Sequence, residues 1–238
     1  LSVLVICFAI PDNNDFIQKQ PNNELRCIRN LEIQTETERQ VVASSNQEML
    51  MRDKEKILLY RNLLNASVYF EYGCGGSTEL ACANNPNLEI HSIDTSDHWI
   101  KAVKENKCIQ EGVEKQRVHM TWVDIGELTS FGYPATEAKK HQWPLYSESI
   151  KKIGGKVDFV LIDGRFRVAS FLKSLLYTNS SKTKIAVHDF FYRPPYYGVL
   201  KYADVVDCQD QLIILQGKPH YDQKELLDDL HAHQYAGL

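Results

Sequence analysis

The chain has 238 residues, of which 43% are hydrophobic and 24% are charged, and its formal net charge is −4. This composition is typical of a globular protein and excludes a chain that is disordered throughout. The length suffices for one α/β domain with a large core, or at most for two small domains. The slightly acidic balance argues against a general binder of nucleic acid or membrane surfaces, so we expect neither as a partner.

The chain begins with an apolar run over residues 1–10, which Pro11 ends. This run is too short to span a bilayer, and it is compatible either with the remnant of a signal or anchor segment or with an N-terminal strand or tail. Residues 11–45 are polar and show poor periodicity. We therefore predict an N-terminal arm over residues 1–45.

The six cysteines are scattered along the chain, with no C-x-x-C pair. Their spacing predicts neither a zinc site nor a dense disulfide framework, and we expect Cys74 and Cys82 to be small buried thiols. N-glycosylation sequons begin at Asn65 and Asn179, which is compatible with a secretory route, although such triplets often arise by chance. The sequence therefore favours neither a cytoplasmic nor a secretory location.

From residue 46 onward, apolar residues recur at helical spacing, which predicts a helix up to Leu63 with Ser45 or Asn46 as its cap. Strand and helix patterns then alternate. Strands are predicted at residues 67–73, 88–94, 117–124, 156–163 and 183–191, and helices at residues 77–85, 97–110 and 166–177. Such alternation implies parallel strands joined by right-handed crossovers, and therefore a doubly wound α/β sheet of the Rossmann-like type.

The end of the chain breaks this alternation. After a short helix around residues 197–203, two strand-like runs within residues 204–217 are separated only by a tight polar turn, which predicts an antiparallel hairpin. Residues 126–155 are long and irregular, which is typical of a functional or disordered loop. We therefore predict one mostly parallel domain over residues 46–217, followed by a C-terminal tail over residues 218–238.

Three glycines, Gly73, Gly75 and Gly76, lie between the first strand of the domain and its helix. A glycine cluster at this position lets the backbone approach a ligand closely, at the carboxyl edge of the sheet where such folds bind ligands. The dinucleotide fingerprint G-x-G-x-x-G would need a third glycine where this chain has Thr78. The phosphate loop also fails to match, because no lysine follows these glycines.

The run from Glu71 to Gly75, E-Y-G-C-G, resembles the first motif of the class I S-adenosylmethionine-dependent methyltransferases, E-x-G-x-G. In that family the glycine backbone lies under the methionine and ribose part of the cofactor. The resemblance implies that Asp94, at the end of the second strand, accepts hydrogen bonds from the ribose hydroxyls. It also implies that Asp124 contacts the adenine, although Asp124 taken alone is better explained as an ordinary strand-end residue. The terminal antiparallel hairpin is typical of the same family.

The resemblance covers residues 46–217 and implies S-adenosyl-L-methionine as the cofactor. The residues predicted to bind it are Glu71, Gly73, Gly75, Gly76, Asp94 and Asp124. Two further motifs, I-D-G-R-F-R and H-D-F, resemble a subgroup of methyltransferase-like proteins whose substrates are poorly defined.

Arg165 and Arg167 follow Asp163 in the loop and first turn of the next helix. Two arginines at a helix start oppose the helix dipole, which favours anions there. We expect one of them to form a salt bridge with Asp163 or Asp189, and the other to bind an anionic substrate, but the sequence does not distinguish the two. Asp189 is included with both arginines among the predicted substrate-binding residues.

His188 and Asp189 end the next strand and should lie at the same edge as Asp163. We predict His188 as the general base of a transfer to a hydroxyl, with Asp163 as the alternative, because histidine titrates near neutral pH. A histidine at a strand end is also often only a structural residue. The edge further resembles metal-dependent O-methyltransferases, whose acids at these strand ends hold a divalent cation such as Mg²⁺ or Ca²⁺. Phe190 stands where that group has its third ligand, which argues against a metal.

These observations predict an S-adenosylmethionine-dependent methyltransferase that acts on a hydroxyl of a small-molecule or carbohydrate-like acceptor. Two alternatives are a non-catalytic binding protein that keeps the fold, and a nucleotide-sugar or dinucleotide enzyme, which the missing third glycine disfavours. Aromatic residues near the same edge either form a wall for the acceptor or belong to the core: Tyr133, Trp143, Tyr146, Phe190, Tyr192, Tyr196 and Tyr197.

Overall fold

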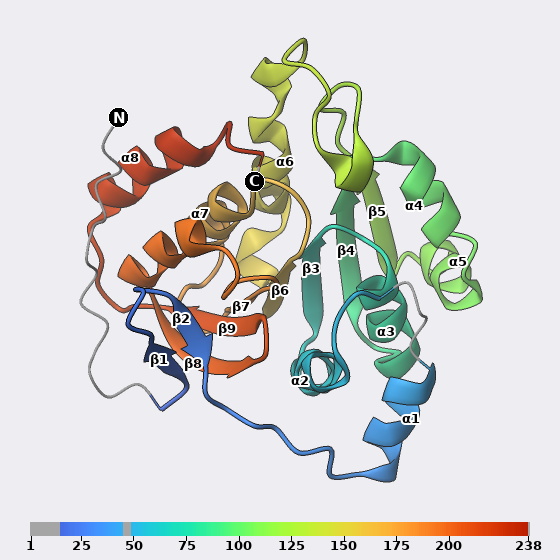
Figure 1. Ribbon diagram of the computed structural model, residues 1–238. Helices are drawn as coiled ribbons and strands as arrows, with labels where there is room; N and C mark the ends of the chain where they lie inside the picture. Colours follow the sequence, from blue (N-terminus) through green and yellow to red (C-terminus); the bar gives the residue numbers. More distant parts are fainter. Residues whose placement is uncertain (1–14, 45–48, 238) are drawn as a thin grey trace.

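A seven-stranded sheet forms the centre of the molecule in a computed structural model that describes residues 15–44 and 49–237 (Figure 1). The parallel strands are β3 (Val68–Tyr72), β4 (Glu89–Asp94), β5 (Val118–Trp122), β6 (Phe159–Ile162) and β7 (Lys184–Val187). β8 (Ala203–Gln209) and β9 (Leu212–Gly217) form an antiparallel hairpin, and β9 pairs with β7. The strand order is β5-β4-β3-β6-β7-β9-β8, which confirms the predicted α/β sheet with its terminal hairpin.

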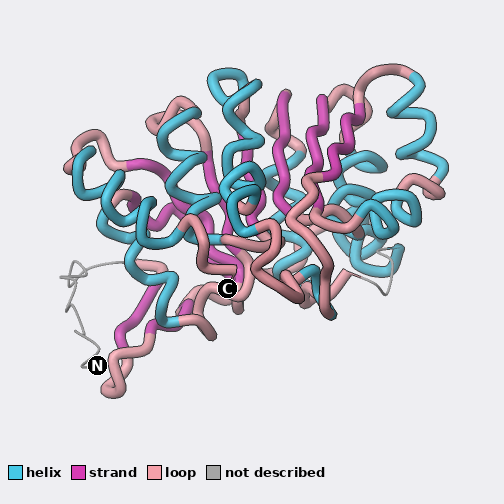
Figure 2. Tube along the Cα trace, turned by 90° about the horizontal axis from the view of Figure 1, so that it is seen from above, coloured by secondary structure: helices cyan, strands magenta, loops and turns pink. Residues whose placement is uncertain are grey.

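Different helices cover the two faces of this sheet (Figure 2). One face packs against α2 (Asp53–Leu63), α3 (Gly76–Asn84), α4 (Asp97–Val103) and α5 (Lys107–Glu114), and the other against α6 (Pro144–Glu148), α7 (Arg167–Tyr177) and α8 (Gln223–His233). Successive strand residues alternate between the two cores: Tyr69 lies in the first and Phe70 in the second. Because both faces are buried, β6 is apolar throughout, whereas β3 and β4 also carry polar residues.

Two helices differ from their predicted bounds. α2 begins at Asp53, where the Glu55 carboxylate accepts a hydrogen bond from the backbone N–H of Arg52 (2.7 Å); the predicted caps at residues 45 and 46 lie outside the described residues. The helix predicted over residues 97–110 is split into α4 and α5, because the Asn106 side chain accepts the N–H of Cys108 and starts a new helix.

The long segment after β5 is ordered in short pieces. It contains η1 (Ser130–Gly132), η2 (Lys140–Gln142), α6, η3 (Ser149–Lys152) and η4 (Gly154–Lys156). Trp143 and Tyr146 from this segment are buried in the core shared with α7. A further short helix, η5 (Pro194–Lys201), connects β7 to β8 where a helix was predicted.

The described part of the N-terminal arm packs on the domain. β1 (Ile17–Lys19) and β2 (Leu25–Cys27) form an antiparallel hairpin whose residues Ile17 and Leu25 join the core. The hairpin is followed by α1 (Glu36–Ser44), which lies beside α2 (Figure 1). The apolar run at residues 1–10, considered above as an anchor remnant, lies outside the described residues. Within the described ranges, no helix is both long enough and apolar enough to cross a bilayer.

The segment after Gly217, predicted as a tail, contains α8. Asp222 caps this helix by accepting the backbone N–H groups of Lys224 (2.8 Å) and Glu225 (3.1 Å). Leu226 and Leu230, one turn apart, are buried against the α7 side of the sheet.

Two disulfides tie distant elements together. Cys27 of β2 pairs with Cys208 of β8, and Cys82 of α3 pairs with Cys108 of α5. Cys74 is a buried free thiol. The expectation of a buried thiol is therefore confirmed for Cys74 and wrong for Cys82. The partners are 181 and 26 residues apart, so no local spacing pattern identifies either pair.

Gly73 allows the chain after β3 to touch the chain after β6. Its φ is +95°, in the region that favours glycine, and a Cβ added to it would lie only 2.9 Å from the backbone N and Cα of Gly164. Gly76 is packed in a similar way, with Met49 as its neighbour. Packing within the protein thus already accounts for two of the three clustered glycines.

We expect Gly73→Ala to lower the free energy of unfolding by at least about 1 kcal/mol, because it combines a strained φ with backbone overlap. Gly155→Ala is the matched control, since nothing lies within 4 Å of a Cβ at that position. The control should leave stability unchanged or raise it by under about 1 kcal/mol. Urea unfolding of both variants measures the difference, and equal stabilities would contradict the close-approach explanation.

Candidate functional site

The residues that follow β3, β4, β6 and β7 meet at one edge of the sheet because these strands are parallel. The backbone hydrogen bonds continue past the strand ends: Asp163 N–H donates to Tyr72 (2.9 Å) and His188 N–H donates to Ile162 (3.1 Å). Most of the predicted site residues therefore lie on a rigid extension of the sheet.

Glu71 is fully buried within β3. Its carboxylate accepts hydrogen bonds from the hydroxyls of Tyr69 (2.9 Å), Ser77 (2.7 Å), Thr78 and Ser92. Burial raises the pKa of this carboxyl, and the hydroxyl donors oppose that shift. Glu71 thus joins the start of α3 to β3 and β4. Its effect on a ligand would be indirect, through the position of residues 73–76, which we call the glycine loop.

Asp94 stands beside this loop at the end of β4. Its Oδ2 atom accepts the N–H of Cys74 (3.2 Å) and its Oδ1 atom accepts the N–H of Ser96 (2.9 Å). Partial burial raises the pKa of the carboxyl. Each oxygen keeps a further lone pair for a ligand hydroxyl, so the geometry suits the predicted contact to ribose.

Trp99 covers the glycine loop from α4, and the sequence analysis did not single it out. Its indole N–H donates to the Cys74 carbonyl (2.7 Å), and its ring lies 3.5 Å from the position of a Cβ on Gly75. Gly75 has φ +154° and differs from the other two clustered glycines. The nearest atoms to a Cβ at this position all belong to the Trp99 ring, and none belongs to the backbone.

Asp124 lies after β5 and is used locally. It forms an ion pair with Lys139 and accepts the N–H of Gly126 (3.0 Å), and these contacts lower the pKa of its carboxyl. The residue fastens the start of the long segment after β5. Its predicted contact to adenine would have to share the carboxylate with Lys139.

The ends of β6 and β7 carry a cluster of charged side chains. Arg167, only 4% exposed, donates to the carbonyl of His188 (2.5 Å) and to the Asp189 carboxylate (3.2 Å), and it lies 3.1 Å from Asp163 Oδ1. Arg193 also reaches Asp189, at 3.4 Å. Arg167 is therefore the arginine that forms salt bridges, which resolves the choice that the sequence left open.

His188 is buried between carboxylates. Its Nδ1 atom lies 3.1 Å from Asp163 Oδ1, and its Nε2 atom lies 3.5 Å from Glu55 Oε2 on α2. Burial alone would lower the pKa of His188, but these carboxylates raise it to about 10. This shift favours the protonated imidazole at neutral pH and argues against His188 as the general base, a role that stays a prediction.

The same contacts keep Asp163 ionised. Burial raises the pKa of its carboxyl, but the positive charges of His188 and Arg167 outweigh burial and lower the pKa. Glu55, the carboxylate of α2 that faces His188, was not singled out in the sequence. No sequence pattern connects a residue of α2 to the end of β7.

Two side-chain clusters have the composition of a cation site. In the first, Asp163, His188 and Asp189 lie within metal-ligand distance of one another, but Arg167 and the protonated imidazole already supply the positive charge. The second is formed by Glu89, His91 and His119. Its imidazole rings stack at 4.5 Å with 17° between their planes, so a single ion cannot lie in both ring planes. Neither arrangement suits a metal ion as it stands.

Arg165 is 6% exposed, and its guanidinium lies 4.0 Å from the centre of the Tyr133 ring. Among residues 15–44 and 49–237, neither its Nε nor its Nη1 atom has a hydrogen-bond partner, and the same holds for the hydroxyl of Tyr196. Buried donors without acceptors are costly. Arg165 therefore suits the anion-binding role that the sequence assigned to one of the two arginines.

Two of the six non-glycine residues with positive φ in the described ranges lie beside these side chains. Phe166 has φ 52° and ψ 41°, and Asp189 has φ 56°, so both adopt the left-handed conformation. The Phe166 ring is fully buried against Trp143 and Tyr146, which compensates for the strain. Strained residues cluster at functional sites more often than elsewhere, and this pair flanks Asp163.

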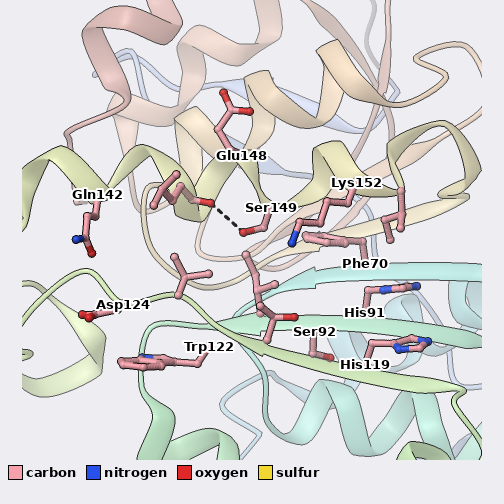
Figure 3. Close-up of a pocket in the computed structure, with 15 residues that line it drawn as sticks. Phe70, His91, Ser92, His119, Trp122, Asp124, Gln142, Glu148, Ser149 and Lys152 are labelled. Atoms are coloured by element: carbon pink, nitrogen blue, oxygen red, sulfur yellow. Dashed lines mark hydrogen bonds between the residues drawn. The ribbon is translucent and has the colours of Figure 1, made fainter.

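A separate hollow of about 560 Å³ lies on the sheet face between β4, β5 and the segment around α6 and η3 (Figure 3). Phe70, His91, His119 and Lys152 are among the residues that line it. Of the residues predicted for the cofactor and the reaction, only Asp124 lines it. α6 has five residues, so this part of the sheet face is only partly covered.

Comparisons with known proteins identify the fold. No family model matches the sequence, and no curated protein does. A methyltransferase-like protein from Silicibacter pomeroyi is 24% identical, with a TM-score of 0.66 over 79% of this chain and 97% of that chain. An SAH-bound methyltransferase from Podospora anserina is 14% identical, with a TM-score of 0.51 over 77% of this chain and 88% of that chain. An O-methyltransferase from Bacillus cereus in complex with SAH is also 14% identical, with a TM-score of 0.50 over 79% of this chain and 93% of that chain. The chain thus has the fold of class I S-adenosylmethionine-dependent methyltransferases, as the resemblance implied.

We expect His188 to stabilise the folded protein below pH 6.5 and to lose this effect as the pH rises through about 10, because folding raises its pKa from 6.5 to about 10. The contribution at its maximum is on the order of a few kcal/mol. Urea unfolding of wild type and His188→Gln between pH 7 and 10 tests this, and the variant should show the shallower decline. His91→Gln is the control, because burial lowers the pKa of His91. Parallel declines in wild type and His188→Gln would refute the assignment.

Proposed function

We propose that this protein is an S-adenosylmethionine-dependent methyltransferase that methylates a hydroxyl of a small-molecule or carbohydrate-like acceptor. The observation that carries the proposal is the arrangement at one sheet edge: the Asp94 carboxylate is held beside the glycine loop, and the ionised Asp163 follows β6 at the same edge. The fold is shared with methyltransferases described as O-methyltransferases and as bound to SAH, which supports both the cofactor and the transfer to oxygen.

Asp94 would hold the ribose hydroxyls of the cofactor, and the backbone of Gly73 and Gly75 would lie under its methionine part. Glu71 and Gly76 would contribute indirectly, because both are occupied by contacts that shape the loop. Asp124 would support the adenine end through the segment that it fastens with Lys139. The bound cofactor supplies an electrophilic methyl group on a sulfonium, which is already a good leaving group.

The chain itself contributes mainly orientation and charge. Asp163, kept ionised by its two cationic neighbours, would accept a hydrogen bond from the acceptor hydroxyl and direct its lone pair. Protonated His188 is then a positioning residue that fixes the Asp163 carboxylate. Asp189 pairs with Arg167 and Arg193, so it would support the site without touching the acceptor.

The buried N–H groups of Arg165 that have no hydrogen-bond partner among the described residues indicate the chemical class of the methyl acceptor. A carboxylate or phosphate on the acceptor would satisfy two guanidinium N–H groups at once, and the Tyr196 hydroxyl offers a further donor. Tyr133, stacked on Arg165, would fix the plane of the guanidinium. We therefore propose a hydroxylated acceptor that carries an anionic group, such as a sugar acid.

Calorimetric titration with S-adenosylmethionine and S-adenosylhomocysteine tests the cofactor. We expect micromolar binding to wild type, weakened about 10- to 100-fold in Asp94→Asn, because the variant loses charge-assisted hydrogen bonds. Asp97→Asn is the matched control: this half-exposed residue forms an ion pair with Lys101 in the next turn, so binding should be unchanged. Folded wild-type protein that binds neither compound would reject the proposal and favour a nucleotide enzyme; binding without transfer to any acceptor class would favour a non-catalytic role.

Transfer of a labelled methyl group to a hexose and to the corresponding uronic acid tests the acceptor. We expect wild type to prefer the acid in kcat/KM by about 10- to 100-fold, which is the value of a charge-assisted contact. Arg165→Gln should abolish the preference, and Arg165→Lys should keep part of it. An unchanged preference in Arg165→Gln, with the fold verified by its unfolding curve, would remove Arg165 from the acceptor site.

A further inference from the structure

We propose that this domain matures in an oxidising and glycosylating compartment of a secretory route, where both disulfides form and where Asn65 and Asn179 carry N-linked glycans. The proposal concerns modification sites rather than the reaction, and it does not depend on methyl transfer. Three features of the described residues support it: the pairing of the cysteines, the exposure of the sequons and the position of both sequons relative to the candidate site.

Four of the five cysteines in the described ranges are paired. The Cα–Cα distances are 5.9 Å for Cys27–Cys208 and 6.1 Å for Cys82–Cys108, within the range of disulfides. In a reducing cytosol such thiols stay reduced, whereas a secretory compartment oxidises them. For each bond, two thiols lose two protons and two electrons, and the electrons reduce the disulfide of a donor protein to a dithiol.

The first disulfide also adds a covalent link to the contacts that hold the N-terminal hairpin on the domain, which include the hydrogen bond from Leu25 N–H to the Tyr197 hydroxyl (3.1 Å). The hairpin β1–β2 is short, and two-stranded hairpins are marginally stable on their own. Cys27 fastens this hairpin to β8, next to the hydrogen bond from Leu31 N–H to the Gln209 side chain (2.7 Å). The arm is therefore built to be cross-linked, which fits an extracytoplasmic environment.

Both sequons lie in exposed turns. Asn65 follows the end of α2 at Leu63, and Asn179 follows the end of α7 at Tyr177. Both asparagines and the sequon serines Ser67 and Ser181 are exposed. Glycans attached at these side chains would project into solvent without displacing core residues.

Both sequons also lie at the sheet edge opposite to the candidate site. Asn65 precedes the start of β3, and Asn179 precedes the start of β7. The starts of these strands are level with each other, because Phe159 pairs with both Tyr69 and Lys184. Asp94 and Asp163 follow the opposite, carboxyl ends of their strands. Glycans at both sequons would leave the proposed cofactor and acceptor sites open.

The test uses the full-length protein isolated from cells that express it naturally. Denatured protein is alkylated before and after reduction and then analysed by mass spectrometry. We expect cysteines Cys27, Cys82, Cys108 and Cys208 to react only after reduction, with Cys74 as the internal control that reacts without it. Treatment with a peptide N-glycosidase should lower the mass and convert Asn65 and Asn179 to aspartate.

Variants separate the parts of this result. Asn65→Gln and Asn179→Gln should each remove one glycan, and Asn87→Gln, an exposed turn asparagine outside any sequon, should remove none. Cys82→Ser should expose Cys108 to alkylation without reduction. Alkylation of all six cysteines before reduction, or a mass that the glycosidase leaves unchanged, would overturn the proposal.

Discussion

The charge pairing at the ends of β6 and β7 determines what the candidate site can do. Arg167 and protonated His188 are buried against the carboxylates of Asp163, Asp189 and Glu55. Removing one member of such a buried network leaves an uncompensated charge, which is far more costly than breaking a surface ion pair. The network therefore favours an ionised Asp163 held in one position before any ligand arrives, and it supports the proposed positioning role of His188.

The residues of the glycine loop and Glu71 are needed for packing within the protein as well as for any contact with a cofactor. Gly73 and Gly76 are needed because backbone or core atoms occupy the space of their missing side chains. Glu71 is needed because several hydroxyls converge on its carboxylate. The presence of these residues is thus explained by the strand-to-helix turn alone, whereas Asp94, which lies outside this motif at the end of β4, has a carboxylate that retains acceptor capacity.

How far the sequence predicts the structure depends on the range of the interactions involved. The succession of strands and helices along the chain and the terminal hairpin could be predicted, because each element carries its own apolar pattern. The position of Asp163, His188 and Asp189 at one edge follows because parallel strands bring their ends together. The raised pKa of His188 could not be predicted, because it depends on the close contact with the Asp163 carboxylate and on Glu55 from a helix that precedes the sheet. The disulfide pairs and the N–H groups left unpaired on Arg165 depend in the same way on three-dimensional proximity.

The link between Cys27 and Cys208 constrains the order in which the chain can be completed. Synthesis delivers Cys27 well before Cys208, since 181 positions separate them, whereas only 26 positions separate Cys82 from Cys108. The shorter link can therefore close soon after its two cysteines are made, but Cys27 has to wait until the β8–β9 hairpin has been synthesised. The β1–β2 hairpin is thus cross-linked later than the α3–α5 pair, and a product truncated before Cys208 could not form this bond.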